Sequence, residues 1–117
     1  MSAKKWITHN APGRRRVIVT KELPGGNWLR RLGKADCAVE VCMSPDMLSA
    51  QEIAAAIGSR CDGAIGQLTE SWGRELFEAL KAAGGTAYSN YAVGYNNVDV
   101  AAATELGIPV GNTPGVL

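Results

Sequence analysis

The fold of this chain is decided by residues 62–90, which read DGAIGQLTESWGRELFEALKAAGGTAYSN. Residues 62–68 form a short apolar run that contains glycines, which is typical of a buried strand approached closely by other backbone. Residues 69–83 have helical spacing and stop at a glycine pair, and residues 86–90 resume as a strand. The apolar stripe of this helix consists of Trp72, Leu76, Phe77 and Leu80. The stretch therefore predicts a strand, a helix and a second strand in succession.

The same alternation extends in both directions. Further strands are predicted at residues 16–20, 38–42 and 108–112, and further helices at residues 28–33, 52–57 and 98–106. This pattern predicts an α/β fold, a flavodoxin-like, doubly wound parallel five-stranded sheet in the order 2-1-3-4-5 with helices on both faces. The final connecting helix is missing from the pattern. Ligands of such folds bind at the carboxyl ends of the strands.

Two helix starts carry capping signals. Ser49 and Glu52 have the spacing of a capping box, in which each side chain accepts from the other residue's backbone N–H. Asn97 is a predicted N-cap for the helix at residues 98–106, with Asp99 in its first turn, where the helix dipole favours an anion.

Length and charge predict one domain with a basic tail. The chain has 117 residues, 46% of them hydrophobic and 20% charged, with a net charge of +1. Residues 1–21 carry six bases and no acid, which leaves 12 − 6 = 6 bases against 11 acids in the rest. We expect a flexible basic tail over residues 1–14 and a domain over residues 15–117. A targeting segment or a nucleic-acid arm is the alternative for the tail, but no aromatic residues are interleaved with its arginines, which argues against nucleic acid.

Several function classes are excluded by what the sequence lacks. No run approaches the roughly 18 apolar residues of a membrane-spanning helix, so no membrane partner is expected. Cys37, Cys42 and Cys61 form no C-x-x-C pair, and we expect buried thiols in a reducing compartment with no metal site. The single histidine, His9, falls in the predicted tail, so no catalytic residue is predicted in this chain. Neither nucleotide-binding glycine fingerprint is present.

The loop at residues 91–97 is the first candidate site. It leaves the carboxyl end of the fourth predicted strand, and Gly94 lets a ligand approach the main chain without a Cβ in the way. Consecutive N–H groups backed by a helix N-terminus suit a carboxylate or a phosphate. A tight turn without a ligand is the alternative. Leu68, at the end of the third strand, offers an apolar wall to the same crevice, and ordinary strand-to-helix packing is its alternative.

Parts of the chain resemble the D-isomer-specific 2-hydroxyacid dehydrogenase family. Residues 93–99 read VGYNNVD and residues 107–115 read GIPVGNTPG, which are similar to two elements typical of that family. Residues 66–73, GQLTESWG, resemble the branch that reduces hydroxypyruvate in plants and algae. The resemblance covers residues 15–117.

The resemblance implies that this chain is the substrate-binding domain of a two-domain enzyme, without its nucleotide-binding domain. Full-length members transfer a hydride from NADH or NADPH to a 2-keto acid, here hydroxypyruvate or glyoxylate, and form homodimers. In the family, the residues matching Val93 and Gly94 donate backbone N–H groups to the substrate carboxylate. The position matching Leu68 lines the substrate pocket, and the one matching Thr113 lies near the cofactor.

The same resemblance places the family's arginine, histidine and partner carboxylate after Leu117. We therefore expect the isolated chain to be inactive and not to bind NAD(P)H strongly. Relatives are peroxisomal or cytoplasmic, and no targeting signal is visible in this chain. A noncatalytic flavodoxin-like module for small carboxylates or for protein interaction remains the alternative. A phosphoacceptor receiver domain is rejected, because Lys21-Glu22 and Gln67-Leu68 stand where it needs acidic residues.

Overall fold

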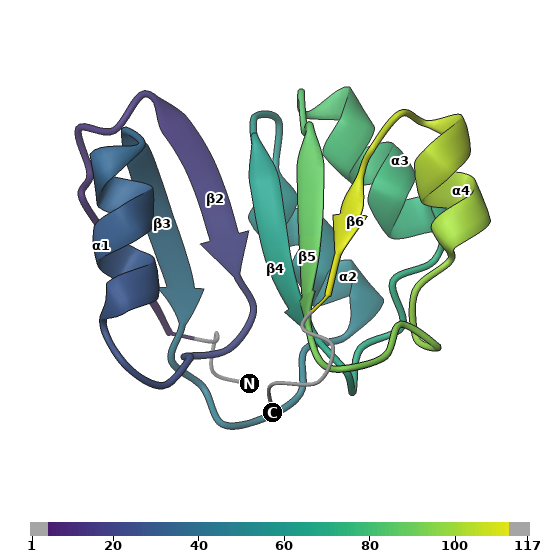
Figure 1. Ribbon diagram of the computed structural model, residues 1–117, viewed down its shortest axis with the longest axis horizontal. Helices are drawn as coiled ribbons and strands as arrows, with labels where there is room; N and C mark the ends of the chain where they lie inside the picture. The colour runs from purple at the N-terminus through teal and green to yellow at the C-terminus, as the bar shows by residue number, and fades with distance from the viewer. Residues whose placement is uncertain (1–4, 113–117) are drawn as a thin grey trace.

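A computed structural model describes residues 5–112, in which strands and helices alternate from the second strand onward (Figure 1). The elements in chain order are β1 (Trp6–His9), β2 (Arg15–Val19), α1 (Asn27–Lys34), β3 (Cys37–Cys42), α2 (Ala50–Ile57), β4 (Gly63–Gln67), α3 (Arg74–Ala82), β5 (Ala87–Tyr91), α4 (Val100–Glu105) and β6 (Val110–Gly111). None of the helices in this part of the chain is long and apolar enough to cross a membrane.

The strands form one sheet in the order β1-β3-β2-β4-β5-β6. The five strands expected from the sequence, β2 to β6, lie next to one another and all run parallel. β1 is a sixth strand and pairs antiparallel with β3. The sheet is therefore mixed, and the prediction of five strands, all parallel, is wrong on this point.

The prediction of a flexible tail over residues 1–14 is wrong for residues 6–9, which form β1, while residues 1–4 of that tail lie outside the described residues. Trp6 packs against the hydrophobic core, and the Met43 N–H donates to the Lys5 carbonyl at 2.8 Å. His9, expected in a tail, lies exposed on β1 opposite Val39. Because β3 would otherwise be an edge strand, its free backbone groups are satisfied by this segment. The pairing of this segment with β3 was not predicted, because the basic residues on both sides of it indicated a solvated tail.

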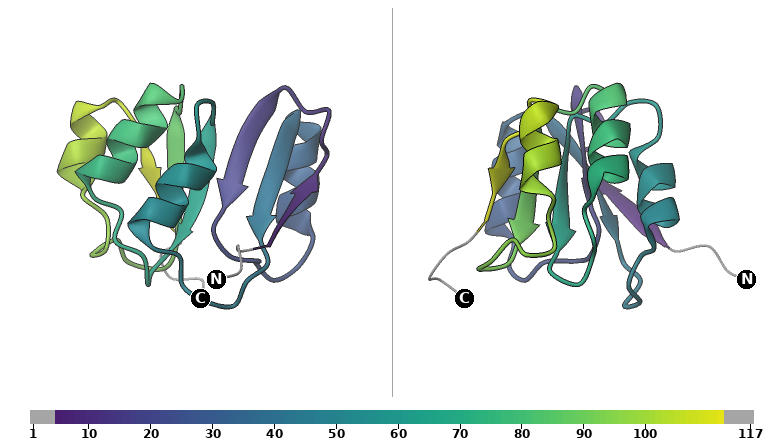
Figure 2. Two further views of the ribbon diagram at one scale, coloured as in Figure 1. Left: turned by 180° about the vertical axis from the view of Figure 1, so that it is seen from behind. Right: turned by 90° about the vertical axis from the view of Figure 1, so that its right-hand side faces the viewer.

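The helices cover the two faces of the sheet unequally. α2, α3 and α4 pack on one face around a core that includes Ile18 and Phe77, and α1 packs on the other around Val17 and Val19. Figure 2 shows the three helices in front of the sheet and α1 behind it when the molecule is seen from behind. On the α1 face, β4 and β5 have no helix over them among the described residues, and Ser89 is exposed there.

Helix α3 begins at Arg74, five residues later than predicted. Trp72 lies outside the helix and forms a β-bridge with Val98. The Trp72 N–H donates to the Asn97 carbonyl and the Asp99 N–H donates to the Trp72 carbonyl, each at 2.9 Å. The indole is fully buried, with ring centroids 4.3 Å from Tyr88 and 5.7 Å from Phe77. The apolar spacing therefore includes a residue that lies before the start of the helix. Trp72 is not helical because its backbone pairs with a distant segment.

The two predicted caps have different outcomes. The capping box of Ser49 and Glu52 is present, with both reciprocal bonds, at 2.9 and 3.1 Å. The predicted N-cap Asn97 is wrong: α4 begins at Val100, and its cap is Asp99, whose carboxylate accepts from the Ala102 N–H at 3.0 Å. The Asn97 side chain instead donates to the carbonyl of the last residue of β4 and to a carbonyl of the segment after it.

Candidate functional site

The candidate site lies in two loops at the carboxyl ends of neighbouring strands. We call residues 68–73 the β4 loop and residues 92–99 the β5 loop. β4 and β5 are parallel and pair Gln67 with Tyr91, so the two loops leave the sheet side by side. Leu68 is therefore placed on one loop, with Val93 and Gly94 on the other. Thr113, the fourth predicted residue, lies outside the described residues.

This end of the sheet exposes apolar side chains. Leu68 is 57% exposed and Val93 is 49% exposed, and sequence reasoning missed two similar neighbours, Met47 at 64% and Tyr95 at 55%. All four follow the carboxyl ends of β3, β4 or β5. Ligands of parallel sheets bind at this end, so these exposed apolar side chains are candidate walls of a ligand site. Their common signal in the sequence is their position within five residues after a strand.

The backbone of the β5 loop presents free hydrogen-bond donors. Within residues 5–112, neither the Val93 nor the Gly94 N–H has an acceptor. A Cβ built on Gly94 would meet nothing within 4 Å, so the space beside this backbone is open. The Val93 and Gly94 carbonyls, in contrast, are both engaged, by Asn112 and by Asn90. Free N–H groups beside open space suit a carboxylate.

The predicted support of an anion on the β5 loop by a helix dipole is wrong. The β5 loop was expected to run directly into a helix whose dipole would support an anion. Because α4 starts only at Val100 and its first turn is capped by the Asp99 carboxylate, the helix end is already satisfied. Any anion on this loop is therefore held by the loop's own N–H groups.

A buried polar network, which sequence reasoning missed, ties the two loops together. Asn97 donates its side-chain amide to the carbonyls of Gln67 at 3.0 Å and Glu70 at 2.8 Å. Asn90, fully buried, donates to the side-chain oxygen of Asn97 at 2.9 Å and to the Gly94 carbonyl at 3.1 Å. The Tyr88 hydroxyl donates to the side-chain oxygen of Asn90 at 2.8 Å. The alternation of residues 87–90 is the only sequence signal, since it places Tyr88 and Asn90 on the same, buried face.

Glu70 completes this network from the β4 loop. Its side chain is 5% exposed, and one carboxylate oxygen accepts from the Trp72 indole and from the Gln67 N–H, each at 3.0 Å. Burial and the nearby Glu70 charge raise the pKa of Tyr88 well above its ordinary value. The Tyr88 hydroxyl therefore keeps its proton and remains a donor to Asn90 at neutral pH.

Gly66 shows how tightly the network is packed. A Cβ at this position would lie 2.3 Å from the Tyr88 hydroxyl and 2.5 Å from the Trp72 indole nitrogen. The glycines of residues 62–68 were expected to allow the close approach of other backbone. At Gly66 the approaching groups are instead polar groups of side chains. Only glycine leaves room for them.

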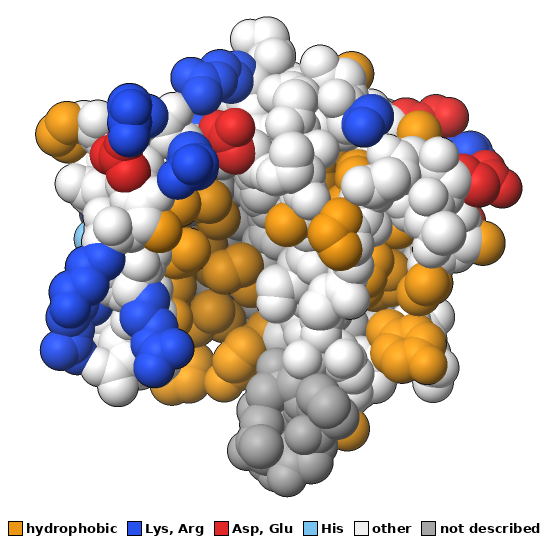
Figure 3. Space-filling view, turned by 45° about the horizontal axis from the view of Figure 1, so that its top comes forward, with side chains coloured by type: hydrophobic (Ala, Val, Ile, Leu, Met, Phe, Trp, Pro, Cys, Tyr) orange, Lys and Arg blue, Asp and Glu red, His pale blue; other side chains and the backbone are white. Residues whose placement is uncertain are grey.

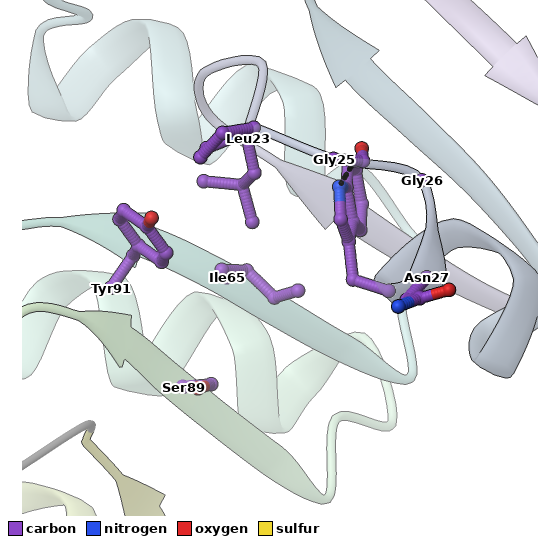
Figure 4. Close-up of a pocket in the computed structure, with 9 residues that line it drawn as sticks. Leu23, Gly25, Gly26, Asn27, Ile65, Ser89 and Tyr91 are labelled. Atoms are coloured by element: carbon purple, nitrogen blue, oxygen red, sulfur yellow. Dashed lines mark hydrogen bonds between the residues drawn. The ribbon is translucent and has the colours of Figure 1, made fainter. Parts of the chain in front are cut away.

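Hollows adjoin the sheet on its α1 face and beside the β4 loop. A volume of about 420 Å³ opens on the α1 face, where Leu23, Ile65 and Tyr91 form its apolar floor (Figure 4). Figure 3 shows apolar side chains gathered in a hollowed area beside Lys and Arg side chains. The hollow is not lined by Leu68, Val93 or Gly94. A smaller hollow of about 220 Å³ adjoins the β4 loop, and Lys21, Gln67 and Thr69 are among its lining residues.

The described residues place no metal centre at this site. No group of three or more His, Cys, Asp or Glu side chains is placed within residues 5–112 to hold a metal ion. His9 pairs with the amino-terminal half of β3, at a distance from the loops along the sheet. All three cysteines are buried and free, and burial raises the pKa of the Cys61 thiol. The site can bind and orient an anion through its backbone.

Known proteins are similar to this chain in sequence. Over 109 residues the chain is 57% identical to glycerate dehydrogenase of Cucumis sativus, a match that covers 92% of the chain and 28% of the relative. It is 56% identical over 110 residues to the peroxisomal glycerate dehydrogenase HPR of Arabidopsis thaliana, again with 28% of the relative covered. The chain thus spans little more than a quarter of the length of these relatives.

A solved structure is similar to this chain in fold. The crystal structure of the TT0316 protein from Thermus thermophilus superposes with a TM-score of 0.78 and 35% identity, covering 87% of this chain and 31% of that one. The family model described as D-isomer specific 2-hydroxyacid dehydrogenase, catalytic domain, matches residues 17–117. The chain therefore belongs to the D-isomer specific 2-hydroxyacid dehydrogenase family, as a portion of its catalytic domain.

Proposed function

We propose that this chain is the substrate-binding part of a reductase that converts hydroxypyruvate or glyoxylate into the corresponding 2-hydroxy acid. The Val93 and Gly94 N–H groups bind the carboxylate of the 2-keto acid, and Leu68 forms an apolar wall beside it. One observation carries the proposal. In a chain of this family, two N–H groups without acceptors among the described residues open onto solvent-facing space beside exposed apolar side chains.

Neutral backbone donors suit this task. A carboxylate held by two N–H groups forms charge-assisted hydrogen bonds, and the reacting carbonyl carbon next to it is fixed in position. The loops themselves are fixed by the network of Asn90 and Asn97, so little ordering has to accompany binding. We infer that this domain binds and orients the keto acid and that the proton and the hydride come from groups outside the described residues.

The family implies NADH or NADPH as the hydride donor, and the residues present do not fit a dinucleotide. Such a site needs a glycine-rich turn that joins a strand directly to a helix N-terminus. Here residues 20–26, with Pro24, separate β2 from α1, and the start of α4 is occupied by the Asp99 carboxylate. Residues 5–112 therefore offer the dinucleotide no site of this kind, and contact of Thr113 with its nicotinamide end stays a prediction.

The setting of the whole protein is proposed from its relatives. A relative from Arabidopsis thaliana is named as peroxisomal, and we propose the peroxisome or the cytoplasm for this protein. We also propose that residues 15–117 form the substrate-binding domain, and that the full-length protein is a homodimer with no nucleic-acid partner.

A chimera tests the function. The 109 aligned residues of this chain would replace those of the Cucumis sativus enzyme, and NADH oxidation would be followed with hydroxypyruvate and with glyoxylate. We expect turnover within about tenfold of the parent enzyme, because the exchanged residues are 57% identical. A factor of ten corresponds to about 1.4 kcal/mol in free energy. A folded chimera without turnover would contradict the proposal.

The alternative of a noncatalytic carboxylate-binding module is tested with the 117-residue chain itself. Titration calorimetry with hydroxypyruvate would measure its affinity directly. Millimolar or tighter binding by the chain, together with an inactive chimera, would favour the module over the reductase.

A further inference from the structure

The two carbonyl groups next to the free N–H groups are each held by an asparagine side chain. Asn112, directly after β6, donates its side-chain amide to the Val93 carbonyl at 2.6 Å. Asn90, at the buried face of β5, donates its side-chain amide to the Gly94 carbonyl at 3.1 Å. The two carbonyls belong to consecutive peptide groups, so one side chain of β5 and one from the residue after β6 fix both planes that meet at Gly94.

Fixing a carbonyl also fixes the N–H of the same peptide group. In a trans peptide the C=O and N–H bonds point in opposite directions, and the described residues contain no cis peptide. The Gly94 N–H shares its plane with the Val93 carbonyl, so it points away from Asn112. The bond from Asn112 therefore sets the direction of the donor that the proposed function assigns to the substrate.

Asn90 is itself held in place before any ligand arrives. Its side-chain oxygen accepts from Tyr88 at 2.8 Å, and its side-chain nitrogen also reaches Asn97 at 2.9 Å. With the Asn90 side chain beneath the loop, the Gly94 carbonyl is drawn toward the protein interior. The backbone of Gly94 is thus clamped from below by Asn90 and from the side of β6 by Asn112.

We propose that Asn112 is a positioning residue for substrate binding, which acts by orienting the Gly94 N–H, and that Asn90 supports it by holding the next peptide. This inference rests on the proposed function. It adds a role for a side chain that contacts the loop's backbone and has no contact with the substrate in the proposal.

The test uses the chimera with Asn112→Ala and with Asn112→Asp, which keeps the size of the side chain but loses the donor. We expect KM for hydroxypyruvate to rise about five- to tenfold, as for loss of one hydrogen bond. The values of kcat and of KM for NADH stay unchanged. Asn10→Ala is the matched control, because Asn10 also donates its side-chain amide to a backbone carbonyl, that of Cys37 at 3.0 Å, away from the loops. It should leave all three parameters unchanged.

A merely structural role gives a different result. If Asn112 only stabilised the fold, its variants would lower the active fraction, and kcat would fall while KM for hydroxypyruvate stayed constant. That outcome in a chimera with normal turnover would overturn the inference while the proposed function stands.

A second measurement separates the inference from the function. In the ¹⁵N-labelled 117-residue chain, Asn112→Ala should lower the heteronuclear NOE of the Gly94 amide and shift its resonance, whereas Asn10→Ala should change neither. An unchanged Gly94 resonance and NOE in Asn112→Ala would overturn the positioning role, whether or not the wild-type chimera is active.

Discussion

The side-chain amide of Asn97 lies 3.0 Å from the carbonyl oxygen of Gln67, and this contact attaches the β5 loop to the end of β4. Asn97 reaches the Glu70 carbonyl as well, at 2.8 Å, so one side chain joins the loop that carries Gly94 to the loop that carries Leu68. The proposed carboxylate site and its apolar wall are therefore held as one unit.

Gly94→Ala tests the open space beside the free N–H groups. The added methyl group meets nothing in the protein within 4 Å, and Gly94 does not have a positive φ, so the fold should be unaffected. The methyl group would crowd a bound carboxylate, and we expect KM for hydroxypyruvate to rise about tenfold or more in the chimera. Gly33→Ala, equally open in α1, is the control. Equal KM values for the two variants would argue against the site.

Gly66→Ala tests the packing beneath the loops. Its Cβ would lie 2.3 Å from the Tyr88 hydroxyl and 2.5 Å from the Trp72 indole nitrogen, and both rings are buried and unable to move aside. We expect the free energy of unfolding in urea to fall by about 3 kcal/mol. Gly73→Ala, whose Cβ meets nothing within 4 Å, should change it little. A fully stable Gly66→Ala variant would contradict this close packing.

Tyr88→Phe tests the buried hydrogen bond to Asn90. Removing the hydroxyl takes away the 2.8 Å donor and leaves the Asn90 oxygen with the Asn97 amide at 3.3 Å. We expect a loss of about 1–2 kcal/mol in the free energy of unfolding, measured by urea denaturation. Tyr95→Phe, at an exposed tyrosine, should cost nothing measurable. Equal stability of the two variants would show that the bond contributes little.

The pair of Arg16 and Glu40 gives a pH dependence. The Arg16 guanidinium donates two bonds of 2.8 Å to the Glu40 carboxylate and lowers its pKa from the ordinary 4.5. The unfolded chain then takes up this proton at a higher pH than the folded chain. The stabilisation is therefore complete above about pH 4.5 and is lost as the pH falls through the lowered pKa.

Glu40→Gln should accordingly flatten the loss of stability below pH 4.5, measured by thermal unfolding at a series of pH values. Asp36→Asn is the control, because the pair of Asp36 and Arg14 is exposed and screened by solvent. If Glu40→Gln and the wild type lose stability in parallel, the pair does not contribute to stability in this pH range.

The cysteines should be unreactive in the folded chain. Cys37, Cys42 and Cys61 are all buried, and burial raises the pKa of Cys61, which suppresses its reactive thiolate. We expect no reaction with a disulfide reagent such as DTNB over minutes in the native state and reaction of all three thiols in guanidinium chloride. Rapid modification in native buffer would show that the core opens easily.

Local signals in the sequence predicted the local features of the fold. The capping box of Ser49 and Glu52 depends only on residues three positions apart, and the alternation of strands and helices depends on short-range periodicity. Trp72 was assigned to a helix because its spacing fits one, but its pairing with Val98 could not be seen from either segment alone. β1 was missed for the same reason, since Trp6 finds its place only against β3.

In the candidate site, too, local positions could be predicted and contacts between distant residues could not. Leu68 and Gly94 were predicted because each follows a strand and parallel strands bring their carboxyl ends together, and Val93 was named from the family resemblance. The asparagines that hold them were missed, because a side chain that satisfies distant carbonyls has the same appearance in a sequence as a solvated one. Asn97 was given a capping role that belongs to Asp99, two residues later.

The antiparallel strand β1 has a consequence for how the domain behaves at high concentration. A long, exposed edge on β3 would offer a template for strands of other molecules, and edge-to-edge growth of this kind leads to aggregation. β1 closes that edge with four residues, and β6, on the opposite side, has only two. Removing residues 5–10 would expose the β3 edge and should turn a monodisperse preparation into one that precipitates.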